Sequence, residues 1–220
     1  MAYTVKEMFY SLQGEGAQAG RAAVFCRFAG CNLWSGREAD RAKAICRVCD
    51  TDFVGDNGPG GGRFQTPQEL ALAVAAHWPP DPPEEHALSP GLNPRLVVLT
   101  GGEPSLQVDP PLVQALHQQG FRVALETNGT LPAPTGVDWV CVSPKTDAPL
   151  AQTSGDELKL LFPQQGLDPE HFSRLNFRHF FLQPIDSPQR EENTRAAVAF
   201  CLAHPRWRLS LQTHKYLGIP

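Results

Sequence analysis

Three cysteines in the first quarter of the chain have a spacing that can hold metal. Cys31, Cys46 and Cys49 follow the pattern C-x14-C-x2-C. The first residues contain no apolar core of a secretory signal, so we expect an intracellular protein whose clustered cysteines bind metal instead of forming disulfides. A structural zinc site takes four ligands, whereas a four-iron cluster held by three thiolates leaves one iron open for another ligand. The cysteines alone do not distinguish a zinc site from a three-thiolate iron cluster.

Polar segments follow several strand-like runs of the sequence. Near-continuous apolar runs are typical of parallel strands that are covered on both faces, and they occur at residues 21–28, 96–100, 122–127, 139–143, 157–162, 178–183 and 208–213. The cysteines follow the first run, Gly-Gly-Glu-Pro (101–104) the second and Ser143-Pro-Lys145 the fourth. Because the carboxyl ends of parallel strands share one edge of a sheet, we expect these segments to form one site.

Helical patterns alternate with the predicted strands. We expect helices at residues 67–78, 110–119 and 191–203, and the first two begin with Thr66 and Asp109 ahead of proline. The alternation predicts a parallel α/β sheet, but 220 residues are few for a full eight-fold barrel. We therefore expect one domain over residues 1–220 that forms a modified, incomplete (β/α) barrel. The glycine-rich segment 55–62 is expected to be a loop, and the proline-rich segment 79–94 a solvated linker.

Composition and charge exclude several other classes. The chain has 19 Lys+Arg against 23 Asp+Glu, a net charge of −4, and 41% hydrophobic residues. This composition indicates a globular protein, and without a basic run we expect no binding to nucleic acid. No apolar stretch approaches the roughly 18 residues of a membrane span. A soluble, cytoplasmic protein is the expectation.

The Gly-Gly-Glu-Pro segment and the three-cysteine loop together resemble the radical S-adenosylmethionine superfamily. In that superfamily this segment holds the amino acid end of the cofactor, and Gly101 and Gly102 lack a Cβ that would block a close approach. The cysteine spacing departs from the C-x3-C-x2-C that is usual there. The resemblance implies a [4Fe-4S] cluster on Cys31, Cys46 and Cys49, whose open iron binds S-adenosylmethionine.

Three further segments are similar to the 7-carboxy-7-deazaguanine synthase family, some members of which have an enlarged cluster loop. They are Phe9-Tyr-Ser-Leu-Gln-Gly-Glu-Gly16, Arg27-Phe-Ala-Gly-Cys-Asn-Leu-Trp34 and Cys49-Asp-Thr51, and the similarity extends to Pro220. It implies a lyase of 7-deazapurine (queuosine) biosynthesis that converts 6-carboxy-5,6,7,8-tetrahydropterin to 7-carboxy-7-deazaguanine and ammonia. In this family an adenosyl radical abstracts hydrogen from C6, S-adenosylmethionine is regenerated and Mg²⁺ assists.

The resemblance also implies a substrate site and a magnesium ligand. The magnesium ligand would be Thr51, although a hard cation would more ordinarily choose the carboxylate of Asp50. Arg27 would bind the substrate carboxylate through its guanidinium fork. Glu15 could bind the guanidine-like edge of the pterin or be a solvated turn residue. The implied substrate-binding residues are Leu12, Gln13, Gly14, Arg27, Thr100 and Pro220, the last through its terminal carboxylate.

A second set of positions matches the cofactor site of the family. The implied S-adenosylmethionine contacts are Val48, Cys49, Asp50, Gly102, Ser143, Pro144, Lys145, Gln183, Pro184, Ile185 and Asp186. We expect Cys26, Cys141 and Cys201 to be packing residues, and we assign no histidine a catalytic role.

Family analogy further implies a homodimer and an electron-donor protein such as flavodoxin. Two alternatives remain at this point. One is a glycyl-radical-activating enzyme, which uses a similar fold and consumes its cofactor. The other, from a different class, is a zinc-stabilised binding module.

Overall fold

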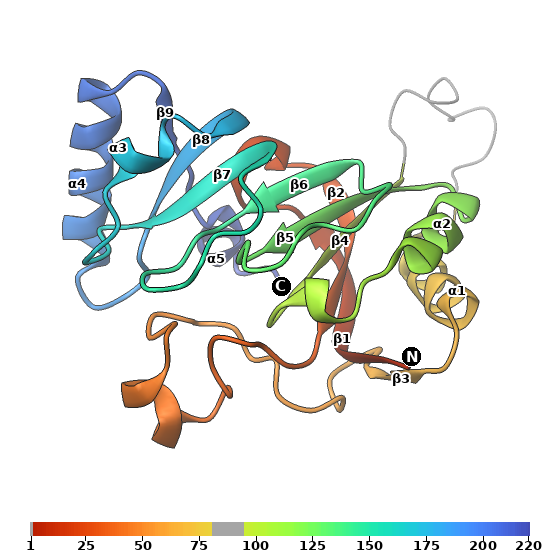
Figure 1. Ribbon diagram of the computed structural model, residues 1–220. Helices are drawn as coiled ribbons and strands as arrows, with labels where there is room; N and C mark the ends of the chain where they lie inside the picture. Colours follow the sequence, from red (N-terminus) through yellow and green to blue (C-terminus); the bar gives the residue numbers. More distant parts are fainter. Residues whose placement is uncertain (1, 81–94) are drawn as a thin grey trace.

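The structure, a computed structural model, describes residues 2–80 and 95–220, and in these residues nine strands form one sheet (Figure 1). The spatial order is β3-β1-β2-β4-β5-β6-β7-β8-β9. Strands β2 and β4 to β9 pair in parallel, as predicted, whereas β1 is antiparallel to both β2 and β3. The strands are β1 (Tyr3–Leu12), β2 (Ala22–Phe28), β3 (Gly62–Phe64), β4 (Arg95–Gly101), β5 (Phe121–Thr127), β6 (Trp139–Val142), β7 (Ser154–Phe162), β8 (Asn176–Pro184) and β9 (Trp207–Leu209).

Helices connect many of these strands, and two of them begin as the sequence predicts. At the start of α1, Thr66 Oγ1 accepts from Glu69 N and the Glu69 carboxylate accepts from Thr66 N, both at 3.2 Å. At the start of α2, Asp109 accepts from Leu112 N at 3.0 Å. These caps satisfy N–H groups that have no partner inside a helix. The helices are α1 (Pro67–His77), α2 (Pro110–Gln118), α3 (Pro169–Phe172), α4 (Arg190–Ala203) and α5 (Thr213–Leu217), with 3-10 turns η1 (Gly16–Gln18), η2 (Glu38–Lys43) and η4 (Pro104–Leu106). Among the described residues, none of the helices combines the length and apolar character that a membrane span requires.

One face of the sheet packs against the helices. In Figure 1, α1 and α2 lie together beside the β1–β5 end, and α4 lies beside β8 and β9. Alternate strand residues point into these helices and are fully buried, which gives one large core under α1 and α2 and a second one under α4. Burial of each such Leu or Phe side chain stabilises the folded state by roughly 1.5–3 kcal/mol relative to leaving it exposed. The core residues of the strands include Val24, Cys26, Phe28, Val97, Leu99, Val123, Leu125, Leu158, Leu160, Phe180 and Leu182.

The intervening residues of the same strands point to the opposite face. Near the amino ends of the strands these residues are apolar, with Ala23, Val98 and Ala124 in one small cluster. Toward the carboxyl ends they become polar or charged. Since side chains alternate along a strand, a single register places an apolar core on one face and chemically active groups on the other.

Three sequence expectations about the elements need correction. Tyr3–Leu12 is a strand that the sequence analysis missed, so the cysteine loop follows the second strand in the chain and not the first. The predicted last strand, residues 208–213, ends at Leu209, where its pairing with β8 ends, and Thr213 begins the helix α5. The glycine-rich segment is partly a strand, because β3 begins at Gly62. Most of the predicted linker 79–94 lies outside the described residues.

The segment between Cys31 and Cys46 folds around its own small core. Trp34, Ala44 and Phe53 are buried together, with the rings of Trp34 and Phe53 edge to face at 5.7 Å. The guanidinium of Arg41 lies 4.1 Å from the centre of the Trp34 ring. Its Nη1 also donates to the carbonyl oxygens of Arg47 and Cys49, at 3.0 and 3.1 Å. These contacts tie the insertion to the segment that carries the last two cysteines.

Candidate active site

A cavity of about 410 Å³ opens on the polar face, at the carboxyl ends of the parallel strands. Its volume is within the range of about 300–1,000 Å³ that is typical of small-molecule sites. The wall combines the cysteine loop, the turn after β1, the ends of β2 and β4 to β8, and the C-terminal segment. Its charged or titratable residues are Glu7, Glu15, Arg27, Cys31, Cys46, Cys49, Asp50, Asp52, Glu126, Cys141, Lys145, Lys159, His214 and Lys215.

Most residues that the sequence singles out meet in this wall. All three clustered cysteines, the six implied substrate-binding residues, Thr51, and Val48, Asp50, Gly102, Ser143, Lys145 and Gln183 line the cavity. Pro144, Pro184, Ile185 and Asp186 do not line it, although Pro184 and Asp186 border a small adjoining hollow. The three segments expected to meet at the strand ends, which contain the cysteines, Gly101 and Gly102, and Ser143 and Lys145, therefore line one cavity.

The three clustered cysteines are arranged as sulfur ligands that neighbouring N–H groups and a cation can stabilise. Leu33 N donates to Cys31 Sγ at 3.4 Å. The thiol of Cys49 donates to the sulfur of Cys46, and this bond, helped by Lys145 and the N–H of Val48, lowers the pKa of Cys46 to about 6 despite burial. A lowered pKa means a thiolate, which is the form that binds metal. Hydrogen bonds to the sulfurs are also a feature of cluster ligands.

The donor set fits an iron–sulfur cluster better than a single metal ion. Three thiols from one loop line one cavity. Cys26, the nearest further cysteine in the sequence, is buried in the core instead, and Cys141 and His214 reach the wall from other elements. Within residues 2–80 and 95–220, no group of three or more His, Cys, Asp or Glu side chains is arranged about one metal ion. The carboxylates on either side of Thr51 are also engaged, since Asp50 pairs with Lys215 at 2.6 Å and Asp52 with Lys6 at 3.0 Å.

Gly101 and Gly102 allow a close contact between two backbone segments. A Cβ on Gly102 would lie 1.9 Å from the carbonyl oxygen of Gly30, and a Cβ on Gly101 would lie 2.3 Å from that of Phe28. The segment therefore packs directly on the backbone that leads into Cys31, and Glu103 N donates to Gly30 O at 2.9 Å. Because neither glycine has a side chain, the cysteine loop can pack against β4, and both glycines still line the cavity.

Arg27 presents one side of its guanidinium to a carboxylate of the protein and the other to the cavity. Its Nε donates to Glu7 Oε1 at 2.8 Å, and its charge lies 5.8 Å from the ring of Phe9. Phe9 in turn stacks on Phe25 at 5.2 Å. The side chain of Arg27 is only 22% exposed, so an anion bound to its terminal nitrogens would be partly shielded from water.

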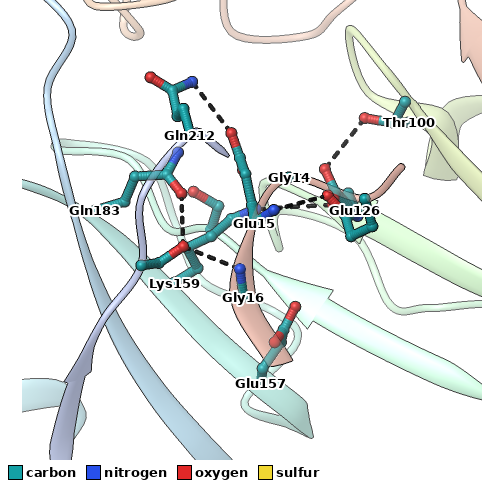
Figure 2. A network of polar contacts seen from close by, with 12 residues as sticks. Gly14, Glu15, Gly16, Thr100, Glu126, Glu157, Lys159, Gln183 and Gln212 are labelled. Carbon is teal, nitrogen blue, oxygen red and sulfur yellow. Dashed lines mark hydrogen bonds and ion pairs between the residues drawn. The ribbon is translucent and has the colours of Figure 1, made fainter. Parts of the chain in front are cut away.

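A buried ammonium on the polar face lies between two carboxylates (Figure 2). Lys159 Nζ is 2.5 Å from Glu15 Oε2 and 3.7 Å from Glu126 Oε1. Gln212 Nε2 donates to Glu15 at 3.1 Å, and Gln13 Nε2 donates to Glu126 at 3.0 Å. Glu15 is thus part of a buried network and not a solvated turn residue.

The turn after β1 is fixed by the C-terminal segment. Thr213 donates to the carbonyl oxygen of Gly14 through both its N–H (3.0 Å) and its hydroxyl (2.9 Å). A Cβ on Gly14 would lie 2.2 Å from the ring of His214, so only glycine allows this contact. Of the expected pterin-binding groups, the Gly14 carbonyl and the Gln13 amide are therefore already engaged within the protein.

The C-terminal segment also reaches the cavity. Pro220 lines the wall, and its carbonyl oxygen accepts from Ser11 Oγ at 2.8 Å, although the residue is exposed. Lys215 Nζ contacts Asp50 at 2.6 Å and Asp186 at 2.7 Å. Lys215 therefore joins the cysteine loop to the segment after β8.

Sequence reasoning assigned no role to several residues of the wall, although Glu126, His214 and Lys215 are in polar segments at predicted strand ends. The residues without an assigned role are Glu7, Phe9, Glu126, Lys159, Gln212, His214 and Lys215. Of the cysteines expected to pack, Cys26 is in the core, and Cys201, which is on α4, is partly buried against the second core. Cys141 is buried but also lines the cavity. A charge at an inward position of an apolar strand, as in Glu126 and Lys159, is the signal that could have found the strand residues.

The fold and the cavity define an α/β protein with an enzyme-like site at the carboxyl edge of a mostly parallel sheet. No protein-family model matches the chain. It is 62% identical over its full length to the 7-carboxy-7-deazaguanine synthase of Caulobacter vibrioides and 57% identical to that of Burkholderia multivorans, and each alignment covers the whole of both chains. The crystal structure of QueE from Escherichia coli superposes with a TM-score of 0.64 at 27% identity and covers 96% of this chain and 94% of that one. The chain belongs to the 7-carboxy-7-deazaguanine synthase family.

Proposed function

We propose that this protein is a lyase that converts 6-carboxy-5,6,7,8-tetrahydropterin to 7-carboxy-7-deazaguanine and ammonia in 7-deazapurine biosynthesis. One observation supports this most strongly: the three cysteines of the enlarged loop line the same cavity as Arg27 and the turn after β1. Full-length identity of 62% to a named synthase supports the same activity. On this proposal residues 1–220 form one domain, a partial (β/α) barrel of the radical S-adenosylmethionine type.

Cys31, Cys46 and Cys49 would hold a [4Fe-4S] cluster. The cluster would bind S-adenosylmethionine at its open iron and supply an adenosyl radical for hydrogen abstraction. Lys145, whose Nζ donates to Ser143 O (2.8 Å) and Oγ (2.6 Å), is held beside the cysteines, where its charge favours the ionised form of Cys46.

The other positions implied by the family complete the cofactor site of this proposal. Val48, Asp50, Gly102, Ser143 and Gln183 line the cavity and would contact S-adenosylmethionine directly. Pro144, Pro184, Ile185 and Asp186 would shape the site from behind. Asp186 is tied to Asp50 through Lys215, which supports a shared role of these segments.

The substrate would lie across the polar face of the sheet. Arg27 would bind its carboxylate, which suits a guanidinium with two free terminal nitrogens. Thr100, Leu12, Gln13, Gly14 and Pro220 would border the rings, and Thr51 would bind Mg²⁺. The carboxylates beside Thr51 are neutralised by lysines, which favours a magnesium ion held mainly by the substrate and water.

We further propose that the enzyme is a cytoplasmic homodimer that receives its electron from a flavodoxin-type donor. Family analogy supports these points. Size-exclusion chromatography with light scattering measures the oligomeric state, and the mass of a single chain in solution would contradict the dimer.

The activity is tested with the anaerobically reconstituted protein. Iron and sulfide should give a brown protein that, once reduced and supplied with the carboxypterin, S-adenosylmethionine and Mg²⁺, forms 7-carboxy-7-deazaguanine. The Cys46→Ser variant should lose both the colour and the product. A colourless protein that retains zinc would contradict the proposal and favour a zinc-stabilised binding module.

A further inference from the structure

Lys159 is a buried cation of the cavity wall that the roles proposed above do not use. Its side chain is 6% exposed, and it contacts Glu15 and Glu126 on either side. The three residues come from β7, from the turn after β1 and from β5, so the contact joins segments that are distant in sequence (Figure 2). A buried ammonium is costly unless carboxylates compensate it, and here two do.

The same contact keeps two carboxylates together. Without a cation between them, two acidic groups in one buried site cannot both ionise at little cost. Burial acts to raise the pKa of Glu15, but the Lys159 ammonium lowers it below its usual value of 4.5. Burial acts to lower the pKa of Lys159, but Glu126 and Glu15 raise it well above the usual value for a lysine. Lys159 therefore stays charged at neutral pH, and Glu15 stays a carboxylate.

Neighbouring amides and a hydroxyl fix the orientation of these carboxylates. Gln212 holds one oxygen of Glu15, while Gln13 and Thr100 each donate to Glu126. Both carboxylates also line the cavity. Glu157, a buried carboxylate on β7, does not line it and instead accepts from Ala17 N at 2.8 Å. The wall near Lys159 thus presents a pair of fixed hydrogen-bond acceptors.

We propose that Lys159 is a positioning residue that holds Glu15 and Glu126 as paired acceptors for the N–H groups of the substrate's aminopyrimidinone ring. The proposal rests on the function proposed above, because it assumes a pterin substrate. The ring N–H and one N–H of the 2-amino group form a donor pair like one edge of a guanidinium, which a single carboxylate binds through both oxygens. The second N–H of the amino group is left for the other carboxylate.

This assignment also orients the substrate. Arg27 is on β2 and Glu126 is on β5, with only β4 between them. At about 4.8 Å between neighbouring strands, the two side chains start about 10 Å apart, which is the scale of a two-ring molecule. The carboxylate end would lie at Arg27 and the amino end at Glu15 and Glu126. Lys159 would act only through these two carboxylates.

The test compares two ligands that differ at the amino end. Isothermal titration calorimetry with the cluster-loaded full chain measures 6-carboxypterin against 6-carboxylumazine, which has an oxygen in place of the 2-amino group. We expect the unaltered protein to prefer the pterin by about 100-fold or more. Lys159→Met should reduce this preference to less than about tenfold, while Lys159→Arg keeps most of it.

Charge rescue separates positioning from simple packing. In Lys159→Met/Glu15→Gln one uncompensated charge fewer is buried, so we expect at least about tenfold tighter binding of 6-carboxypterin than in Lys159→Met. The matched control is Arg195→Met, which breaks a surface pair with Glu191 on α4 where Arg195 is 78% exposed, and which should leave the preference unchanged.

Three results would overturn the inference. A Lys159→Met protein that keeps the 100-fold preference overturns it and leaves the proposed function standing, provided that the unaltered protein forms product. If Lys159→Met does not fold, the double variant takes its place, and a preserved preference there has the same meaning. Unaltered protein that binds neither ligand overturns this inference, and the proposed function falls with it if the same protein forms no product from the tetrahydropterin.

Discussion

Arg27 has one fixed contact and one free edge. Its Nε–H donates to Glu7, and among the described residues its other close contact is with the ring of Phe9. The terminal nitrogens of the guanidinium are therefore left for an anion in the cavity. Because Glu7 uses only the Nε–H of Arg27, the terminal N–H groups can bind a second carboxylate, such as the one on the substrate.

Replacing Arg27 with alanine should weaken the binding of 6-carboxypterin by about 100-fold. Each hydrogen bond to a charged group is worth about 1.5–3 kcal/mol, and a 100-fold loss corresponds to about 2.7 kcal/mol. Titration calorimetry measures the affinity, and iron content should be unchanged. Arg63→Ala is the control, since Arg63 pairs with Asp56 at the surface and is 73% exposed. An unchanged affinity in Arg27→Ala would refute the carboxylate assignment.

Glu15 should give the fold an acid-sensitive contribution. Its pKa is below the usual 4.5 in the folded protein, because Lys159 and Gln212 outweigh the opposing effect of burial. Ionised Glu15 therefore stabilises the fold above pH 4.5, and this contribution is lost as the pH falls from 4.5 through the folded-state value.

Urea unfolding of the metal-free protein between pH 6 and pH 3 measures this contribution. Glu15→Gln should make the fall in unfolding free energy shallower, by at most about 1.4 kcal/mol per pH unit, the value for one proton. Identical pH profiles for the two proteins would show that the Glu15–Lys159 pair contributes nothing that depends on ionisation.

At the scale of elements, the sequence predicts the parallel strands and the capped helices well. Continuous apolar runs gave β4, β5 and β8 to within two residues at either end, because strands buried under helices need apolar residues throughout. β1 was missed because its residues mix lysine, glutamate and threonine with apolar ones, as expected for a strand that pairs antiparallel at one side of the sheet. Short elements such as β3 and α5 depend on tertiary contacts that no local pattern reports.

The candidate site divides in the same way. Motifs with fixed local spacing, such as Cys46 to Cys49 and Gly101 to Gly102, can be recognised along the chain. The Lys159–Glu15 and Lys215–Asp50 contacts join residues that are far apart in sequence, so only the fold reveals them. The interior of the 31–46 insertion is another such case, because its core depends on Trp34 meeting Phe53.

Lys215 on α5 should act as a link between elements. Its contacts with Asp50 and Asp186 hold the C-terminal helix, the cysteine loop and the segment after β8 together. Lys215→Met should speed amide hydrogen exchange in residues 46–52 and 213–217 and weaken binding of S-adenosylmethionine about tenfold. Lys43→Met, at an exposed position of η2, is the control. Exchange in residues 46–52 that matches the unaltered protein would show that the link is not needed.

At the scale of the whole molecule, one sheet separates stability from chemistry. Its helix-covered face carries the large cores, and its other face carries the charged groups of the cavity. Polar and ionised groups can therefore be concentrated beside the cysteines without interrupting the main apolar core. This separation lets a chain of 220 residues hold a cluster, a cofactor and a ring-sized substrate in one domain, as proposed.

The fate of S-adenosylmethionine during turnover tests the central proposal most directly. Reduced, cluster-loaded protein with the carboxypterin, S-adenosylmethionine and Mg²⁺ is sampled over many turnovers, and 7-carboxy-7-deazaguanine, methionine and 5′-deoxyadenosine are quantified together. The proposed lyase predicts product that rises steadily while methionine and 5′-deoxyadenosine stay far below it. Methionine and 5′-deoxyadenosine that rise in step with turnover, as in a glycyl-radical-activating enzyme, or the absence of product, would contradict it.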